Sequence, residues 1–197
     1  MDMDIFQVES NKRMPRVGDV IIASPFLYDY YFSRTVTLIV AHDVDGYMGV
    51  IMNKELPTQT TLNELLPELK SFPTIPIQRG GPVDEESLFY VHTLSHLRDS
   101  FPIGDGLYLN GDFDQLLQYI LNGNPVEGHI RFFSGCTGWV EEHMEKDVTV
   151  NNTWLVSKVE KHVLLDYRYK RLWQRSMATM GLPYSIWAKY PEYPSCN

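Results

Sequence analysis

Arg131-Phe132-Phe133-Ser134-Gly135-Cys136-Thr137-Gly138-Trp139 is the stretch around which we expect the fold to be organised. The apolar run at residues 129–134 predicts a β-strand that ends at Gly135. A turn with Gly135 and Gly138 follows, and the acidic residues 140–147 predict a helix. A strand, a glycine turn and a helix start in this order often form a ligand site in α/β proteins. The rest of the chain is therefore expected to hold this turn in place.

Short apolar and β-branched segments predict most of the remaining strands. They lie at residues 20–25, 35–42, 47–54, 75–79, 88–92 and 154–156. The segment 35–42 is apolar almost throughout, which is typical of a strand buried on both faces. It connects to 47–54 through the turn Asp43-Val44-Asp45-Gly46, so the two predict a β-hairpin.

Capping residues and apolar positions at helical spacing predict the helices. Thr61 and Glu64 fit a capping box, and Asp112 begins a helix that ends near Gly123. A further helix is predicted at 169–180, in addition to 140–147, and the segment 183–197 is expected to be irregular. The early hairpin argues against a purely parallel sheet. We therefore predict an α+β fold, a large mixed β-sheet packed with three to four helices. It forms one domain at 16–197 after an N-terminal tail at 1–15.

Composition narrows the class of protein. The chain has 197 residues, and 44% of them are hydrophobic, which suits one domain with a substantial core. The formal net charge of −8 disfavours nucleic acid as a partner. The acidic N-terminus lacks the features of a signal peptide, and no apolar run reaches the roughly 20 residues that span a bilayer. We expect a soluble, cytoplasmic protein that does not bind membranes.

Several segments together resemble the AlgH/YqgE family of bacterial proteins. The resemblance covers roughly residues 16–197. The matching segments, in the order expected for the family, are 18–25, 32–36 with His42, 46–54, 80–83, 88–92, 105–108, 135–139 and 190–194. This chain departs from the family pattern at Cys136, where an aromatic residue is usual, and at 140–143.

The resemblance implies an AlgH-like α+β domain on a large mixed sheet. Family members are described as transcriptional regulators of exopolysaccharide synthesis and contain no recognised DNA-binding motif. Together with the glycine turns and the candidate Arg/Lys cluster described below, this favours an indirect regulator, a binding module for a small anionic ligand or a protein partner. It implies no cofactor and no settled reaction.

Cys136 is the main candidate for an enzyme. A thiol just before a helix start would have a lowered pKa, and His143 is a candidate base. A buried cysteine that acts as a small hydrophobe is the favoured alternative. The enzyme hypothesis is a hydrolase that uses either Cys136 or a pair of histidines, His42 and His92, that converge at strand ends. Because Cys136 and Cys196 are the only cysteines and no third ligand accompanies His92 and His96, we predict no metal site.

The hypothesis of an anion-binding site is based on basic residues at strand ends. Arg34 precedes the strand 35–42 and Asn53-Lys54 ends the strand 47–54, so a hairpin brings them close. Together with Arg79 and Arg131 they are candidates for a positive pocket, with ion pairing to nearby aspartates as the alternative. The candidate ligand-binding residues are Arg34, His42, Asn53, Lys54, Gly80, Gly81, Pro82, His92, Gly135, Gly138 and Trp139.

Three further features leave alternatives open. Gly80-Gly81-Pro82-Val83 predicts a tight bend, which either contacts a ligand beside Arg79 or connects a strand to a helix. Backbone amides around Gly135 and Gly138 either bind an anion or only shape the chain. The basic, aromatic segment 158–175 is consistent with direct DNA binding, although the solvated face of a helix is favoured.

Overall fold

The computed structural model describes residues 9–167 and 169–191. The strands are β1 (Val20–Ala23), β2 (Val36–Asp43), β3 (Gly46–Ile51), β4 (Ile77–Arg79), β5 (Val83–His92), β6 (Phe101–Gly104), β7 (Leu107–Leu109), β8 (Ile130–Trp139) and β9 (Trp154–Ser157). The helices are α1 (Leu62–Leu65), α2 (Phe113–Leu121), α3 (Glu141–Thr149), α4 (Lys161–Leu164), α5 (Leu172–Thr179) and α6 (Tyr184–Trp187), with the 3₁₀ turns η1 (Pro67–Leu69) and η2 (Tyr169–Arg171).

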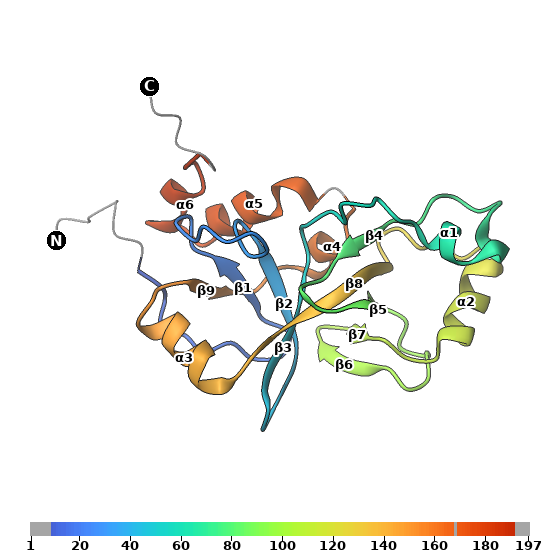
Figure 1. The fold of residues 1–197 in the computed structure, drawn as a ribbon, viewed down its shortest axis with the longest axis horizontal. Helices are drawn as coiled ribbons and strands as arrows, with labels where there is room; N and C mark the ends of the chain where they lie inside the picture. Colours follow the sequence, from blue (N-terminus) through green and yellow to red (C-terminus); the bar gives the residue numbers. More distant parts are fainter. Residues whose placement is uncertain (1–8, 168, 192–197) are drawn as a thin grey trace.

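The nine strands form one mixed sheet (Figure 1). Their order is β6-β7-β5-β8-β3-β2-β1-β9, and β4 pairs with β8 off this path. The β4–β8 pair is parallel and the other pairs are antiparallel. The predicted α+β fold with a large mixed sheet is confirmed, as is the hairpin of β2 and β3. Among the described residues, α2, α3 and α5 are the helices of eight or more residues.

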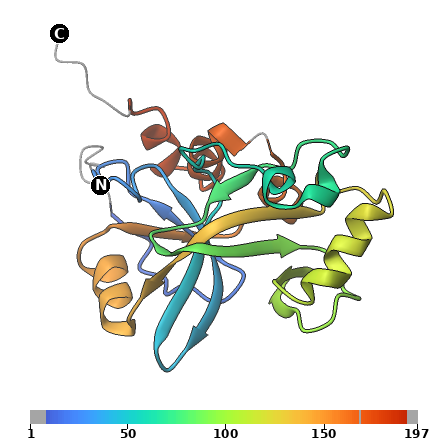
Figure 2. The same cartoon turned by 45° about the vertical axis from the view of Figure 1, so that its right-hand side comes forward.

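The opening stretch forms a strand along its whole length, so the predicted turn at Gly135 and Gly138 is wrong. The first half of β8 pairs with β4 and β5, and residues 137–139 pair with β3. Figure 2 shows β8 running across the sheet between these partners. Because strands flank both halves, the left-handed φ of +72° at Gly135 bends β8 without reversing the chain. Helix α3 begins only at Glu141.

Two glycines after β4 pack directly on the bend in β8. A Cβ on Gly80 would lie 2.1 Å from the carbonyl oxygen of Gly135, and one on Gly81 would lie 2.0 Å from that of Cys136. We call Gly80, Gly81, Gly135 and Cys136 the glycine junction. The bend at 80–83 connects two strands, β4 and β5, so the predicted strand-to-helix turn is wrong.

Helices cover the sheet on two faces. Leu38 of β2 packs in the cluster that holds Trp173 of α5, whereas Ile39 packs with Met144 of α3. Burial of 35–42 on both faces is thus confirmed for Val36–Val40. A third cluster lies under α1 and α2 at the β4–β5 end of the sheet. In the part of the chain that the structure describes, no helix combines the length and apolar character needed to cross a membrane.

Several element boundaries differ from the predictions. Helix α1 has the predicted capping box at Thr61 but stops at Leu65, because Pro67 begins a separate 3₁₀ turn. Strand β6 was not predicted. It is a short edge strand, where Pro102 is tolerated. Helix α6 lies within 183–197, the segment expected to be irregular, and residues 192–197 lie outside the described residues.

The N-terminal segment is docked where it is described. The Asn11 side chain donates to the Val156 carbonyl at 2.6 Å and accepts from the Val156 N–H at 3.2 Å. An amide side chain therefore occupies the outer edge of β9, in the manner of a neighbouring strand.

Candidate ligand-binding site

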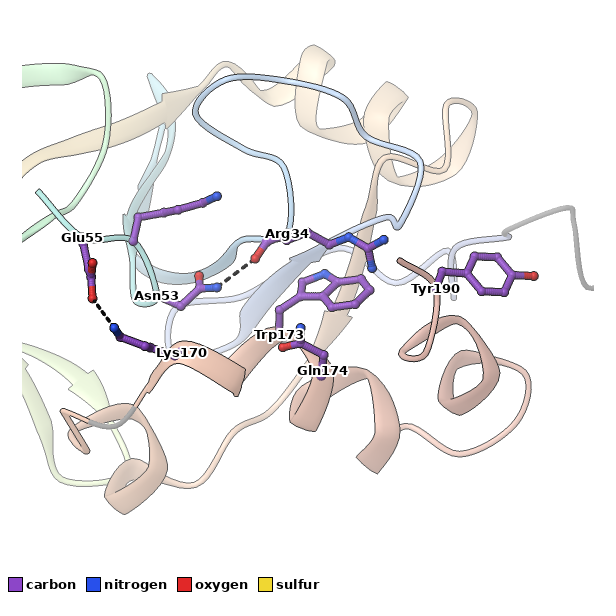
Figure 3. Close-up of a pocket in the computed structure, with 8 residues that line it drawn as sticks. Arg34, Asn53, Glu55, Lys170, Trp173, Gln174 and Tyr190 are labelled. Carbon is purple, nitrogen blue, oxygen red and sulfur yellow. Dashed lines mark hydrogen bonds and ion pairs between the residues drawn. The ribbon is translucent and has the colours of Figure 1, made fainter. Parts of the chain in front are cut away.

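A pocket of about 300 Å³ lies between the start of β2, the end of β3 and helix α5 (Figure 3). We call it the Arg34 pocket. Its lining residues are Arg34, Asn53, Lys54, Glu55, Lys170, Trp173, Gln174 and Tyr190. The structure thus brings together three of the predicted ligand-binding residues, Arg34, Asn53 and Lys54.

Arg34 is held rigidly at one wall of the pocket. Its guanidinium carbon lies 4.0 Å from the ring centroid of Trp173, a cation–π contact, and Nη2 donates to the Pro191 carbonyl at 2.9 Å. The Trp173 ring is fixed in turn, because its Nε1 donates to the Ala23 carbonyl at 2.8 Å. Figure 3 shows the stacked pair, with Tyr190 beyond it. The arginine head is therefore pre-organised.

Asn53 connects the two strands at the pocket floor. Its side chain donates to the Arg34 carbonyl at 2.8 Å and accepts from the Val36 N–H, also at 2.8 Å. The next carbonyl, that of Lys54, accepts from the Arg79 N–H at 3.2 Å. Asn53 therefore positions Arg34 and Lys54, and its own amide is already engaged by backbone.

The lining is basic in an acidic protein. Arg34, Lys54 and Lys170 face one acidic residue, Glu55, whereas the whole chain carries −8. Lys170 Nζ lies 3.1 Å from Glu55 Oε1, an exposed ion pair. No cysteine, histidine or serine is among these described lining residues. The arrangement is suited to bind a carboxylate or phosphate.

Arg79 and Arg131 do not join this pocket, which corrects the larger cluster that was predicted. Arg131 is fully buried and donates to the carbonyls of Met52 and Leu164 and to Gln78 Oε1. The guanidinium of Arg79 lies over Tyr30 and Tyr31, at 5.3 and 5.4 Å from the ring centroids. Arg131 thus joins β8 to neighbouring segments, because its Nη1 and Nη2 donors have buried carbonyl and amide acceptors.

The predicted glycine residues lie elsewhere. Gly80, Gly81 and Gly135 meet backbone to backbone in the glycine junction, too close for even a methyl group. Pro82 follows them, and Gly138 pairs with Met48 of β3. Trp139 packs its ring against Phe32 and Trp154, at centroid distances of 5.6 and 5.7 Å. None of these residues lines the Arg34 pocket, and ligand binding by them stays a prediction.

The two strand-end histidines do not converge. Strands β2 and β5, which carry them, are separated in the sheet by β3 and β8. His92 is fully buried, its Nε2 lies 2.8 Å from the Asn110 carbonyl, and burial lowers its pKa. His96 shares no helix with it. Within residues 9–167 and 169–191, no group of three His, Cys, Asp or Glu side chains could hold a metal ion.

His42 instead belongs to a surface cluster that the sequence did not reveal. Its Nε2 lies 2.7 Å from Glu141 Oε2, and its ring stacks on Tyr47 at 3.9 Å. The Tyr47 hydroxyl donates to the same carboxylate at 3.2 Å. Burial, with the nearby Glu141, raises the pKa of Tyr47 to about 12. Glu141 is remote in sequence, so no local motif could identify this contact.

Cys136 lacks the environment of an activated thiol. It is 5% exposed within β8, and burial, together with Asp84, raises its pKa. The expected lowering of the pKa is therefore wrong, because a strand stands where a helix N-terminus was predicted. His143 is exposed on α3. The favoured alternative, a buried small hydrophobe, fits this position.

The basic segment 158–175 is divided among several elements. Lys158 lies 3.8 Å from Asp19, and Lys170 pairs with Glu55. Arg168 lies outside the described residues. Acidic partners thus offset part of the positive charge on which the DNA-binding alternative depends.

Comparisons with known proteins agree with this fold. A family model described as AlgH-like matches residues 20–185. A UPF0301 protein of Bacteroides fragilis is 43% identical over 197 residues, covering 100% of this chain and 99% of that protein. One from Bacteroides thetaiotaomicron is 42% identical with the same coverage.

Two solved structures are also similar. The solution structure of the AlgH protein from Pseudomonas aeruginosa has a TM-score of 0.65 and 26% identity, covering 88% of this chain and 93% of that one. The crystal structure of DIP2367 from Corynebacterium diphtheriae has a TM-score of 0.73 at 20% identity, covering 92% and 95%, and thus shows a similar fold. The names of these relatives specify no reaction and no ligand.

Proposed function

We propose, from the premise that this chain belongs to the AlgH-like family, that it is a binding module for a small anionic ligand. The ligand site is the Arg34 pocket. The observation that carries the proposal is the gathering of Arg34, Lys54 and Lys170 around one cavity in a protein of net charge −8. The stacked, hydrogen-bonded head of Arg34 supports it further, because a pre-organised cation loses little entropy on binding.

The chemistry of the lining favours recognition over reaction. Arginine and lysine donate to carboxylate and phosphate oxygens with charge-assisted hydrogen bonds. The described lining holds no cysteine, serine or histidine, and Cys136 is buried with a raised pKa. A hydrolase that uses Cys136 is therefore not supported by its surroundings.

We propose that this protein affects gene regulation indirectly. The liganded protein would act through a protein partner in the cytoplasm, because the acidic chain repels phosphate backbones. The measurement is binding to a DNA fragment at several salt concentrations. A logarithm of the binding constant that falls linearly with the logarithm of the salt concentration would overturn the indirect route in favour of phosphate contacts.

Titration with inorganic phosphate at low ionic strength, followed by amide chemical shifts in NMR, tests the ligand site. Lys54→Ala is expected to weaken phosphate binding about tenfold or more, because a hydrogen bond to a charged group contributes about 1.5–3 kcal/mol. Lys70→Ala is the matched control, since Lys70 is exposed and lies outside the pocket lining. Equal affinity in both variants would contradict the proposal.

A further inference from the structure

A second pocket of about 310 Å³ adjoins the Arg34 pocket. Its lining residues are Glu55, Leu56, Gln59, Thr60, Pro76, Ile77, Gln78 and Lys170. Two of them, Glu55 and Lys170, also line the Arg34 pocket. The two cavities therefore share a boundary made of one ion pair.

The boundary is weakly held. Glu55 follows β3 and Lys170 lies in η2, so the ion pair joins two elements across the surface (Figure 3). The two side chains are 55% and 79% exposed. Exposed ion pairs contribute little net stability, so an anion that binds Lys170 can displace Glu55 at small cost.

Gln78, which lines the second pocket, has a buried donor that the described residues leave unsatisfied. Gln78 is 2% exposed, and its Oε1 accepts a hydrogen bond from Arg131 Nη2. Because a guanidinium only donates, this contact fixes the amide with its oxygen toward Arg131. Nε2 is then a donor, and it has no hydrogen-bond partner among the described residues. A buried donor of this kind favours a ligand that brings an acceptor.

We infer that the two pockets form one elongated site, with Glu55 as an internal competitor for Lys170. The inference rests on the proposed function and specifies its ligand class. The ligand carries an anionic group for Arg34 and Lys54 and, along its length, a neutral carbonyl that accepts from Gln78 Nε2. Glu55 occupies Lys170 when the site is empty and restrains the affinity for anions.

The role of Glu55 is tested with inorganic phosphate as the probe. Glu55→Gln removes the competing charge and releases Lys170, so phosphate is expected to bind about threefold more tightly. Glu86→Gln is the control, because it makes the same change of charge at an exposed position of β5 outside both pocket linings. It is expected to leave the affinity within experimental error of that of the unaltered protein. An equal gain in both variants would overturn the role of Glu55, since only net charge would then matter.

The role of Gln78 is tested with two carboxylates of equal length, adipamate, which ends in an amide, and heptanoate, which does not. The protein is expected to bind adipamate about fivefold more tightly, the range for one hydrogen bond to a buried donor. Gln78→Glu keeps an acceptor for Arg131 and removes the Nε2 donor, so this preference is expected to disappear. Succinamate, which is shorter, is expected to show no preference over pentanoate.

The outcomes separate this inference from the proposed function. If Lys54→Ala does not weaken phosphate binding, the Arg34 pocket is not the site and both proposals fail. If Lys54→Ala weakens it, but Glu55→Gln matches Glu86→Gln and adipamate binds no better than heptanoate, the elongated site alone is overturned.

Discussion

The Arg34 pocket and the glycine junction both join segments that are distant in sequence, but they do so in opposite ways. At the junction, Gly80, Gly81 and Gly135 bring backbones so close that side chains are excluded. In the pocket, the long side chains of Arg34 and Trp173 stack on each other at one wall of a cavity. The glycine pattern, which resembles a ligand site in sequence, packs backbone against backbone, whereas the residues that line the Arg34 pocket share no sequence motif.

This contrast predicts where mutations affect stability and where they affect binding. The glycine junction is expected to govern the free energy of unfolding, since nothing there can relax without moving backbone. The Arg34 pocket is expected to govern anion affinity with smaller effects on stability.

The largest effect is expected for Gly135→Ala. A Cβ at this position would lie 2.5 Å from the Gly81 carbonyl oxygen, on a residue with φ of +72°. We expect the free energy of unfolding to fall by about 3 kcal/mol or more, measured by urea denaturation. Gly123→Ala is the control, because Gly123 also has a positive φ but no neighbouring atom within 4 Å. It should cost only about 1–2 kcal/mol. Equal losses would show that backbone conformation alone, without packing, requires glycine at the junction.

An intermediate effect is expected for Arg34→Lys. The charge is kept, but the stacking on Trp173 and the hydrogen bond to Pro191 are weakened. We expect phosphate to bind about threefold more weakly and the free energy of unfolding to fall by about 1 kcal/mol. Arg16→Lys, at an exposed position, is the control in both measurements. Unchanged phosphate affinity would mean that charge alone, without pre-organisation, determines binding.

The smallest effect is expected for Cys136→Ser in a Cys196→Ser background. Phosphate affinity should not change, and the stability should fall by about 1 kcal/mol, because the hydroxyl is buried. Loss of phosphate binding with the fold preserved would give the junction a functional role.

The Cys136 thiol also makes a pH-dependent contribution. Its pKa is raised in the folded protein, so the stabilisation is complete below the free pKa of about 8.5. It is lost as the pH rises toward the folded pKa. Alkylation of the native thiol should therefore remain slow at pH 8.5, and fast alkylation there would contradict the raised pKa.

Local patterns in the sequence determined much of the fold. Apolar runs predicted β2 and β3 and their hairpin, and the caps at Thr61 and Asp112 are present as predicted. These features depend on neighbouring residues, so spacing alone reveals them. The same hairpin geometry correctly brought Arg34 and Lys54 to one pocket.

Only the tertiary structure determined the conformation of residues 131–139 and the set of residues that form the Arg34 pocket. Residues 135–139 form a strand because β3 and β5 supply hydrogen-bonding partners on either side. The local sequence around a glycine is the same whether the glycine bends a paired strand or turns the chain, so the sequence alone does not distinguish the two. Likewise, Trp173 and Lys170 reach Arg34 and Glu55 only after α5 packs on the sheet. Contacts between distant segments leave no periodic pattern in the sequence, and both regions consist of such contacts.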